Sequence, residues 1–182
     1  MDALVERNTW TPTDFAILMV DIDDFKSIND AHGHPTGDRV LLALAQKCQD
    51  LIRNEDLIAR YGGEEFIIVL TKASLANAIK KAKRICRAVA NTHYAINDTK
   101  AAHLLSITVS IGVSAFRKGD TTESVIGRAD QALYFAKGAG KNRVASENEL
   151  IFDSDAKRVS EGFCGQIFPH LGVDLLNGQN AN

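Results

Sequence analysis

The sequence predicts an α+β domain with a ferredoxin-like split βαβ core, in which helices flank a central antiparallel sheet. Three observations predict this fold. Apolar runs of strand length alternate with stretches whose apolar residues recur every three or four positions. A glycine pair between two of the strands predicts a hairpin. That hairpin lies between two predicted helices, which is the order of elements in a split βαβ unit.

The first part of the chain predicts a buried strand followed by a helix. Residues 15–20 (FAILMV) form a continuous apolar run, which is typical of a central strand. Residues 32–37 are predicted to be a Gly-rich loop. Apolar residues then recur at helical spacing over residues 40–51, so we expect an amphipathic helix that faces the core.

The middle of the chain predicts the hairpin and a second helix. Residues 57–60 read as a short strand and residues 66–70 (FIIVL) as its returning partner. Gly62 and Gly63 can supply the positive backbone angles of a tight turn between them. The apolar spacing over residues 75–89 predicts the second helix.

The last elements are a strand at residues 104–116, a helix at 125–136 and an edge strand at 143–145. The pattern weakens beyond these residues. We therefore expect one folded domain, the catalytic one, at residues 1–146, and a C-terminal extension at 147–182 that is partly packed or disordered.

Composition excludes several classes of protein. The chain has 182 residues and a net charge of -2, so a general affinity for nucleic acid is not expected. No apolar run approaches the roughly 20 residues that span a bilayer, so no membrane segment is predicted. The three cysteines, Cys48, Cys86 and Cys164, lack CxxC spacing, which argues against disulfides or zinc and favours a cytoplasmic protein.

An acidic cluster follows the first predicted strand. Asp21, Asp23 and Asp24 repel one another, although a strand end needs only one charge to meet water. Carboxylate oxygens are the ligands that Mg²⁺ prefers, commonly one or two of them together with substrate phosphates. The alternative is a solvated acidic turn, which the cluster alone does not exclude.

A second cluster, Gly62-Gly63-Glu64-Glu65, occupies the predicted hairpin tip. The glycines leave room for a bulky ligand near the backbone, and the glutamates can complete a metal site or accept a proton. A hairpin turn with charged flanks is the simpler interpretation. If the strand before Asp21 lies beside this hairpin, Asp21 and Glu64 converge on one metal-sized space.

The motifs that carry these clusters resemble one family. DIDDFKSIND (residues 21–30), GHPTGD (33–38) and RYGGEEF (60–66) closely resemble the GGDEF family of diguanylate cyclases, in its GGEEF form. Further matches are SIGV (110–113), ADQALYFAK (129–137) and GKN (140–142). The resemblance covers residues 16–144 and implies a fold similar to the palm of nucleotidyl cyclases and polymerases.

The resemblance implies an enzyme that condenses two GTP molecules into cyclic di-GMP and releases pyrophosphate. It implies Mg²⁺ or Mn²⁺, two ions per active site, and a homodimer with one GTP bound to each subunit. An upstream sensory domain is expected in the full-length protein. Only residues 2–4 resemble the family's usual opening, so the N-terminal arm looks truncated.

Residue by residue, the resemblance assigns Asp21, the Ile22 backbone carbonyl and Glu64 as metal ligands, and Glu64 and Glu65 as catalytic groups. The substrate-binding residues that it implies are Phe25, Lys26, Asn29, His34, Asp38, Lys137 and Lys141. Asn29 and Asp38 match the residues that recognise guanine. This is chemically reasonable, since a carboxylate can accept hydrogen bonds from N1-H and the exocyclic amine of guanine, and an amide can both donate and accept. The family often has Arg at the position of Lys141, and Lys lacks the bidentate fork.

Alternative interpretations remain open for single residues. Asn29 can be a helix-end cap, and His34 can be a structural hydrogen-bonding group in the loop. Lys137 can be a cation that stabilises the C-terminal end of its helix through the helix dipole.

A third pattern is regulatory. Arg53 and Asp56 form an RxxD pattern shortly before the glycine pair, which in the family resembles the product-inhibition site. Arg84 falls where a second contact to bound product is expected. A surface salt bridge at a helix end is the alternative.

Three other functions compete with a diguanylate cyclase. A catalytically inactive module that binds GTP or cyclic di-GMP is the first, and the intact Asp21, Glu64 and Glu65 argue against it. A cyclase for adenine or mixed dinucleotides is the second, and Asp38 argues for guanine. A purely structural dimerisation module is the third, and it leaves the acidic clusters unexplained.

Overall fold

A computed structural model describes residues 15–98 and 101–149 of the chain. The expectations for residues 2–4, for Cys164 and for residues 150–182 of the extension lie outside the described residues. Within the described part, no helix is both long and apolar enough to span a membrane.

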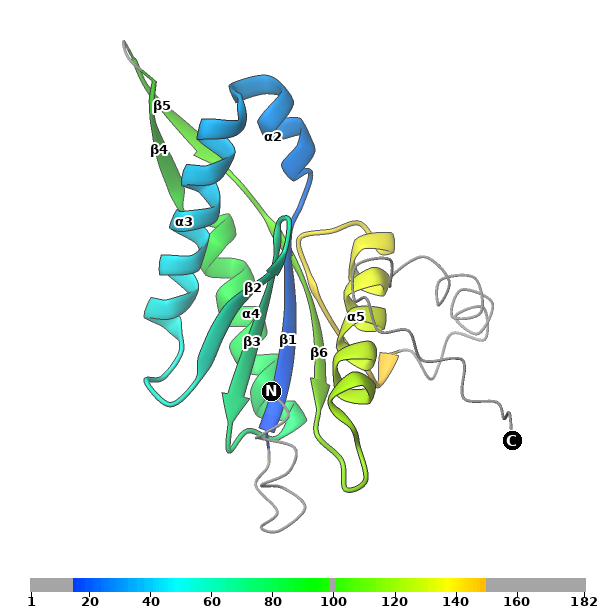
Figure 1. Cartoon of the computed structure of the whole chain (residues 1–182). Coiled ribbons are helices and arrows are strands. Elements are labelled where there is room, and N and C mark those ends of the chain that lie inside the picture. Colours follow the sequence, from blue (N-terminus) through cyan, green and yellow to red (C-terminus); the bar gives the residue numbers. More distant parts are fainter. Residues whose placement is uncertain (1–14, 99–100, 150–182) are drawn as a thin grey trace, which may run out of the picture. The chain divides into compact units, whose positions relative to one another are not determined.

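The α+β fold class is confirmed by a five-stranded sheet with helices on both faces (Figure 1). The strand order is β2-β3-β1-β6-β7, and each adjacent pair among the first four strands is antiparallel, as a split βαβ core requires. The short last strand pairs in parallel with β6. The strands are β1 (Phe15–Ile22), β2 (Leu57–Gly62), β3 (Glu65–Thr71), β6 (Val109–Ala115) and β7 (Val144–Ser146).

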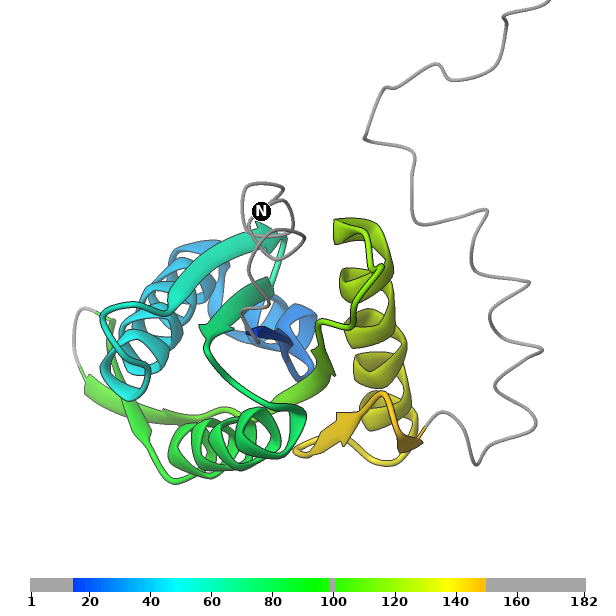
Figure 2. The same cartoon turned by 90° about the horizontal axis from the view of Figure 1, so that it is seen from below.

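The central strand β1 is buried along its whole length because both faces of the sheet are covered. Its even-numbered residues, from Ala16 to Val20, pack in the cluster formed with α3 (His34–Leu51) and α4 (Leu75–Ala90). Its odd-numbered apolar residues pack against α5 (Thr122–Gly138). Figure 2 shows α5 on the opposite side of the sheet from the other two helices. This burial explains the continuous apolar run of the strand.

Local sequence signals set where the helices begin. Ser74 accepts a hydrogen bond from the backbone N–H of Asn77 and so caps α4. Thr121 and Ser124 form a reciprocal capping box at the start of α5. These caps satisfy backbone donors that have no partner inside the helix.

The predicted loop at residues 32–37 is wrong, since most of it is helical. A short helix α2 (Phe25–His32) precedes α3, and only Gly33 separates the two. Gly33 has a φ of 80°, a conformation that glycine adopts without steric cost. Pro35 lies in the first turn of α3, where its missing N–H costs no helical hydrogen bond.

The single strand predicted at residues 104–116 is also wrong. It divides into β5 (Ala101–Ser106) and β6, and β5 pairs instead with β4 (His93–Asp98) in a separate two-stranded sheet. The break lies at Ile107 and Thr108. Thr108 accepts from the backbone N–H of Asp23 and donates its hydroxyl to the Asp23 carboxylate. Periodicity cannot reveal such a change of partner strand.

Candidate active site at the end of the central strands

Asp21 is the next-to-last residue of the buried strand β1, where it lies between Glu65 on β3 and Ser110 on β6. Its side chain is 5% exposed, and its Oδ2 atom lies 2.7 Å from the Lys137 Nζ atom in the last turn of α5. Burial raises the pKa of Asp21, and the Lys137 ammonium acts against that rise. The site therefore holds a largely desolvated carboxylate with a lysine as its counter-charge.

Asp23 faces the interior of the fold. Its carboxylate accepts hydrogen bonds from the hydroxyls of Thr108 and Ser110, both at 2.6 Å, and from the backbone N–H of Asn142 at 2.9 Å. These bonds join the end of β1 to β6 and to the loop that follows α5. Asp23 thus fixes the turn, and Asp24 is the exposed member of the cluster.

The hairpin tip between β2 and β3 presents Glu64 and Glu65. Gly62 pairs with Glu65, so Gly63 and Glu64 make the turn, one residue later than the sequence predicts. Gly63 has a φ of 42°, and open space lies where a Cβ atom would stand on either glycine. Arg60 donates to the Gly63 carbonyl at 2.8 Å and closes the turn. The tip is thus open to a ligand.

The structure brings Asp21, Glu64 and Glu65 together. Burial raises the pKa of Glu65, and the charges of Asp21 and of Asp130 on α5 raise it further. Burial likewise raises the pKa of Asp130. Sequence reasoning missed Asp130, although it precedes Lys137 by seven residues, which is two helical turns on the same face.

The donor chemistry fits a hard divalent cation with incomplete protein ligation. In the described residues, no group of three His, Cys, Asp or Glu side chains could hold a metal ion by itself. Asp21 and Glu64 are oxygen donors close enough for the Glu64 charge to raise the Asp21 pKa, after the larger effects of burial and Lys137. Mg²⁺ commonly takes one or two carboxylates and completes its shell with phosphates and water.

A groove of about 460 Å³ lies between α3 and the edge strand β2, next to the hairpin. Asp38 and Arg60 are its charged residues, and its other lining residues are Leu41, Leu42, Ala45, Ile58, Ala59 and Phe66. An apolar groove with one carboxylate suits a flat aromatic ligand that presents hydrogen-bond donors at one edge.

Asn29 on α2 has a buried side-chain oxygen, Oδ1, that finds no hydrogen-bond partner within residues 15–98 and 101–149. A Cβ atom on Gly37 would collide with this oxygen and would lie 3.1 Å from the Phe25 ring. The glycine therefore makes room for the Asn29 amide. Buried polar atoms rarely go unpaired without a functional reason, so this oxygen points to a missing partner.

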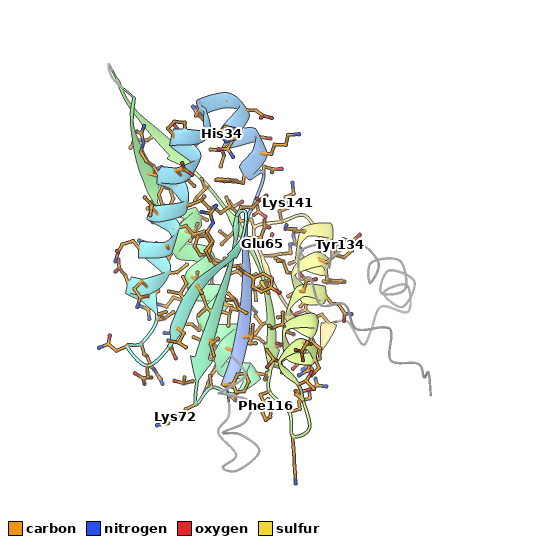
Figure 3. All side chains as sticks on the ribbon, viewed as in Figure 1. His34, Glu65, Lys72, Phe116, Tyr134 and Lys141 are labelled. Atoms are coloured by element: carbon orange, nitrogen blue, oxygen red, sulfur yellow. The ribbon has the colours of Figure 1, made fainter. Side chains whose placement is uncertain are left out.

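The other predicted substrate residues lie around the same end of the sheet. Lys26 is exposed on α2, and His34 is exposed at the first position of α3. Figure 3 places His34, Glu65 and Lys141 towards the same end of the molecule. The Phe25 side chain is buried in the core, which gives its ring a packing role.

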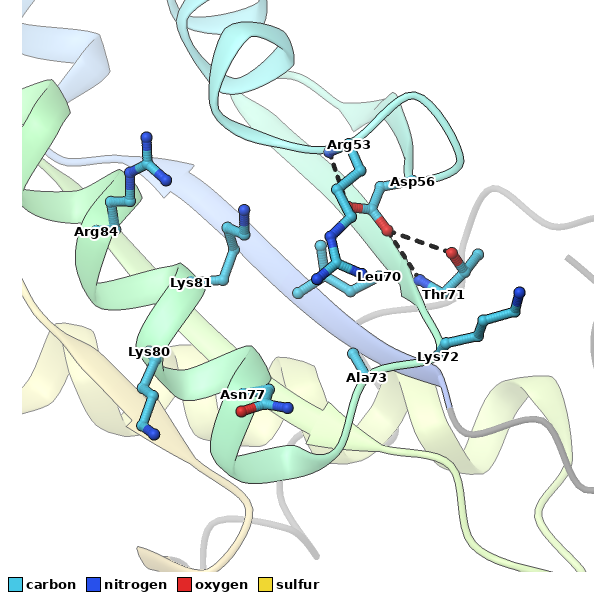
Figure 4. A pocket seen from close by; sticks show the side chains of 10 residues that line it. All are labelled: Arg53, Asp56, Leu70, Thr71, Lys72, Ala73, Asn77, Lys80, Lys81 and Arg84. Atoms are coloured by element: carbon cyan, nitrogen blue, oxygen red, sulfur yellow. Dashed lines mark hydrogen bonds between the residues drawn. The ribbon is translucent and has the colours of Figure 1, made fainter.

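A second pocket, of about 360 Å³, contains all three predicted regulatory residues, Arg53, Asp56 and Arg84 (Figure 4). Sequence reasoning missed the lysines that also line it, namely Lys72, Lys80 and Lys81. The run of cations along α4 was the available signal. A lining with five cations and one carboxylate suits an anionic ligand.

Asp56 itself anchors the pocket wall. One carboxylate oxygen accepts from the Arg53 backbone N–H at 2.9 Å, and the other accepts from the Thr71 backbone N–H at 3.0 Å. Among the described residues, the one ion pair of the Arg53 side chain is a distant contact with Glu55, at 3.9 Å. Arg53 is therefore available to a ligand, while Asp56 holds the loop that presents it.

The sequence matches a family model over residues 1–143, and its description is "Diguanylate cyclase, GGDEF domain". The chain belongs to the GGDEF domain family. The motif resemblance is thereby confirmed, and the acidic centre, formed by Asp21, Glu64 and Glu65, lies on the motifs that carry it.

Named relatives agree with this assignment. Response regulator PleD of Caulobacter vibrioides is 40% identical over 148 residues, which cover 81% of this GGDEF chain and 32% of PleD. Diguanylate cyclase A of Treponema denticola is 43% identical over 137 residues, covering 74% of this chain and 36% of the relative. The chain thus spans about a third of the length of the curated relatives it matches.

Solved structures agree as well. The GGDEF domain of DgcB from Caulobacter crescentus, solved in complex with c-di-GMP, superposes with a TM-score of 0.76 at 32% identity, covering 81% of this chain and 85% of that one. An active GGEEF domain of a diguanylate cyclase from Vibrio cholerae gives a TM-score of 0.71 at 35% identity, covering 80% and 90%.

Proposed function

We propose that this chain condenses two GTP molecules into cyclic di-GMP with release of pyrophosphate. The proposal rests on one observation, namely that the groove and the acidic centre share the hairpin of β2 and β3. The groove reaches Arg60 and Phe66, and the acidic centre contains Glu64 and Glu65 between them. A base in the groove would thus place its triphosphate beside the carboxylates, which is the geometry that nucleotidyl transfer needs.

Guanine is the base that the polar groups favour. The exposed Asp38 carboxylate can accept hydrogen bonds from N1-H and the exocyclic amine of guanine. The Asn29 side-chain oxygen, on the helix α2 that directly precedes α3, supplies a further acceptor. Adenine offers no N1-H donor, so a carboxylate at this position discriminates against it.

Asp21, the Ile22 carbonyl and Glu64 would hold Mg²⁺ or Mn²⁺, two ions per active site with the substrate phosphates. Such ions neutralise phosphate charge and stabilise the attacking and leaving oxygens. Lys137 and Lys141 bind the triphosphate. Glu64 accepts the proton from the 3′-hydroxyl of one GTP as that oxygen attacks the α-phosphate of the other, and Glu65 supports it from the adjacent position.

The active species is a homodimer, because each chain offers one guanine site and the reaction joins two nucleotides. GTP turnover measured against protein concentration tests both claims. We expect dinucleotide as the product, identified by mass, and a specific activity that rises with protein concentration until dimerisation saturates. Absence of dinucleotide at high protein concentration with Mg²⁺ or Mn²⁺ would refute the cyclase assignment and favour an inactive nucleotide-binding module.

The pocket of Arg53, Asp56 and Arg84 is the site of product inhibition. Its five cations match the two phosphates of cyclic di-GMP, and arginine can also bond the Hoogsteen edge of guanine. In the full-length protein, an upstream sensory domain would control how the two cyclase domains meet.

A further inference from the structure

Asp24 and Lys141 form an ion pair between two loops that lie 117 positions apart in the chain, with 2.6 Å between Asp24 Oδ1 and Lys141 Nζ. Asp24 occupies the position of the DIDxFK pattern that the family motif leaves open. Lys141 stands where arginine is common. The family motif therefore does not itself assign a role to this contact.

Both partners have a backbone conformation that non-glycine residues adopt rarely. The φ angle is 56° at Asp24, 60° at Lys141 and 46° at Asn142, all in the left-handed region. Such conformations persist when surrounding contacts hold them. Asp23 supplies one contact by accepting from the Asn142 backbone N–H at 2.9 Å, and Asp24 supplies the other through the Lys141 side chain.

The same loop continues the helix end that carries Lys137. The backbone N–H of Lys141 donates to the Ala136 carbonyl, and that of Gly140 donates to the Lys137 carbonyl, both at 3.2 Å. Lys137 pairs with Asp21 while Lys141 pairs with Asp24, so two neighbouring lysines each have a carboxylate of their own. The hydrogen bond that the Lys141 ammonium donates to Asp24 is the main cause of a raised Lys141 pKa.

We propose that Asp24 is a positioning residue for substrate, which holds the Lys141 ammonium at the edge of the acidic centre to receive the triphosphate. This inference rests on the proposed function. One ammonium donor bonds Asp24, and the others remain for phosphate oxygens. A lysine on a flexible stem lacks the rigid fork of arginine. The carboxylate restricts the lysine before binding and so lowers the entropy lost when the nucleotide arrives.

The opposite effect is the competing interpretation. If Asp24 merely occupies Lys141, the bridge must break before phosphate binds, and removing the carboxylate charge tightens binding. The two interpretations predict opposite signs, so one affinity measurement separates them.

The test uses Asp24→Asn, which removes the charge and keeps a residue that tolerates the left-handed conformation. The probe is 3′-deoxy-GTP with Mg²⁺, which lacks the attacking hydroxyl, and calorimetry gives its Kd. We expect the Kd to rise about three- to fivefold, and the KM for GTP to rise equally at unchanged kcat. Glu123→Gln, at the opposite end of α5, is the matched control for loss of one charge.

Two further variants test the coupling itself. In a Lys141→Met background, Asp24→Asn should no longer weaken binding, because the carboxylate then has no lysine to hold. In the Asp24→Asn background, Lys141→Arg should restore the affinity, since the guanidinium fork is pre-organised. Circular dichroism confirms that each variant is folded.

Tighter or unchanged binding by Asp24→Asn, or an equal loss in the Lys141→Met background, overturns the proposal. A wild-type chain that binds the analogue but forms no dinucleotide refutes the proposed reaction alone, and the binding comparison still decides the role of Asp24. A wild-type chain that does not bind the analogue overturns both.

Discussion

Lys137 reaches from the last turn of α5 to Asp21 at the end of β1, with 2.7 Å between Nζ and Oδ2. The contact joins the two halves of the candidate site, since Asp21 belongs to the acidic centre and Lys137 is a proposed phosphate ligand. Without substrate, the lysine is the counter-charge of a carboxylate that burial would otherwise penalise. Substrate and metal together would replace this pairing.

Lys137→Met leaves the Asp21 carboxylate buried without its cation. We expect the free energy of unfolding to fall by about 1–3 kcal/mol in the absence of divalent metal. Because Mg²⁺ can pair with the same carboxylate, the difference in melting temperature from wild type should narrow when millimolar Mg²⁺ is added. Lys83→Met, at an exposed position of α4, is the control. A gap that Mg²⁺ leaves unchanged argues against metal at Asp21.

Glu64→Gln keeps the size of the side chain at the hairpin turn and removes a partly buried carboxylate. Turnover should fall at least about 100-fold, because a general base and a metal ligand are lost together. The melting temperature should stay within about 2 °C of wild type, since the side chain is only partly buried. Steady-state pyrophosphate release measures the first effect, and wild-type-like turnover would remove Glu64 from its role.

Gly37→Ala places a methyl group against the Asn29 side-chain oxygen and the Phe25 ring. The Asn29 amide must move, so we expect the KM for GTP to rise about tenfold, the size of one hydrogen bond to a buried polar group. Gly127→Ala, where nothing lies near the new methyl group, is the control. Equal KM values for Gly37→Ala and wild type would show that Asn29 does not contact the substrate.

Arg53→Ala removes from the basic pocket an arginine whose ion pair with Glu55 is distant, at 3.9 Å. The concentration of cyclic di-GMP that halves activity should rise about tenfold or more, while the initial rate without product stays constant. Lys83→Ala removes a cation from α4 outside the pocket and should leave inhibition unchanged. An inhibition curve that does not move in Arg53→Ala would exclude the pocket as the inhibitory site.

Asp120 gives the fold a defined response to acid. Burial acts to raise its pKa, but hydrogen bonds from Arg128, the Arg117 backbone and Ser124 lower it from 3.8 to about 2. Because the folded pKa is depressed, this stabilisation is fully present above about pH 4 and is lost as the pH falls through about 2.

Asp120→Asn should therefore cost on the order of 2 kcal/mol at pH 7 and much less at pH 2. Urea unfolding at the two pH values measures the difference. The side chain is 11% exposed, so solvent screening removes little of this effect. A cost that is the same at both pH values would show that the ion pair with Arg128 is not its source.

Some of these expectations needed only local pattern. The buried strand β1, the hairpin and the three long helices follow from apolar runs and spacings that one short segment contains. Their caps, Ser74 and Thr121, are equally local. The acidic cluster and the GGEEF turn could therefore be found and placed at the ends of predicted strands.

Other features depend on partners far apart in the chain. Nothing near Thr108 indicates that it bonds Asp23, 85 positions away, at the break between β5 and β6. Asp130 gains its influence on Glu65 only when α5 lies against the sheet. The lysines of the basic pocket similarly form a shared binding surface with Arg53 only because Asp56 holds the Arg53 loop beside them.

The sequence by itself determined the family, the fold class and the main candidates for site residues, because motif and periodicity reside in short stretches of chain. The tertiary structure alone decided how the three clustered aspartates differ. Asp21 is buried against a lysine, Asp23 turns inward to hold the fold, and Asp24 stays exposed to hold Lys141. Identical side chains acquire different roles because burial and distant partners, which only folding brings together, set the cost of each charge.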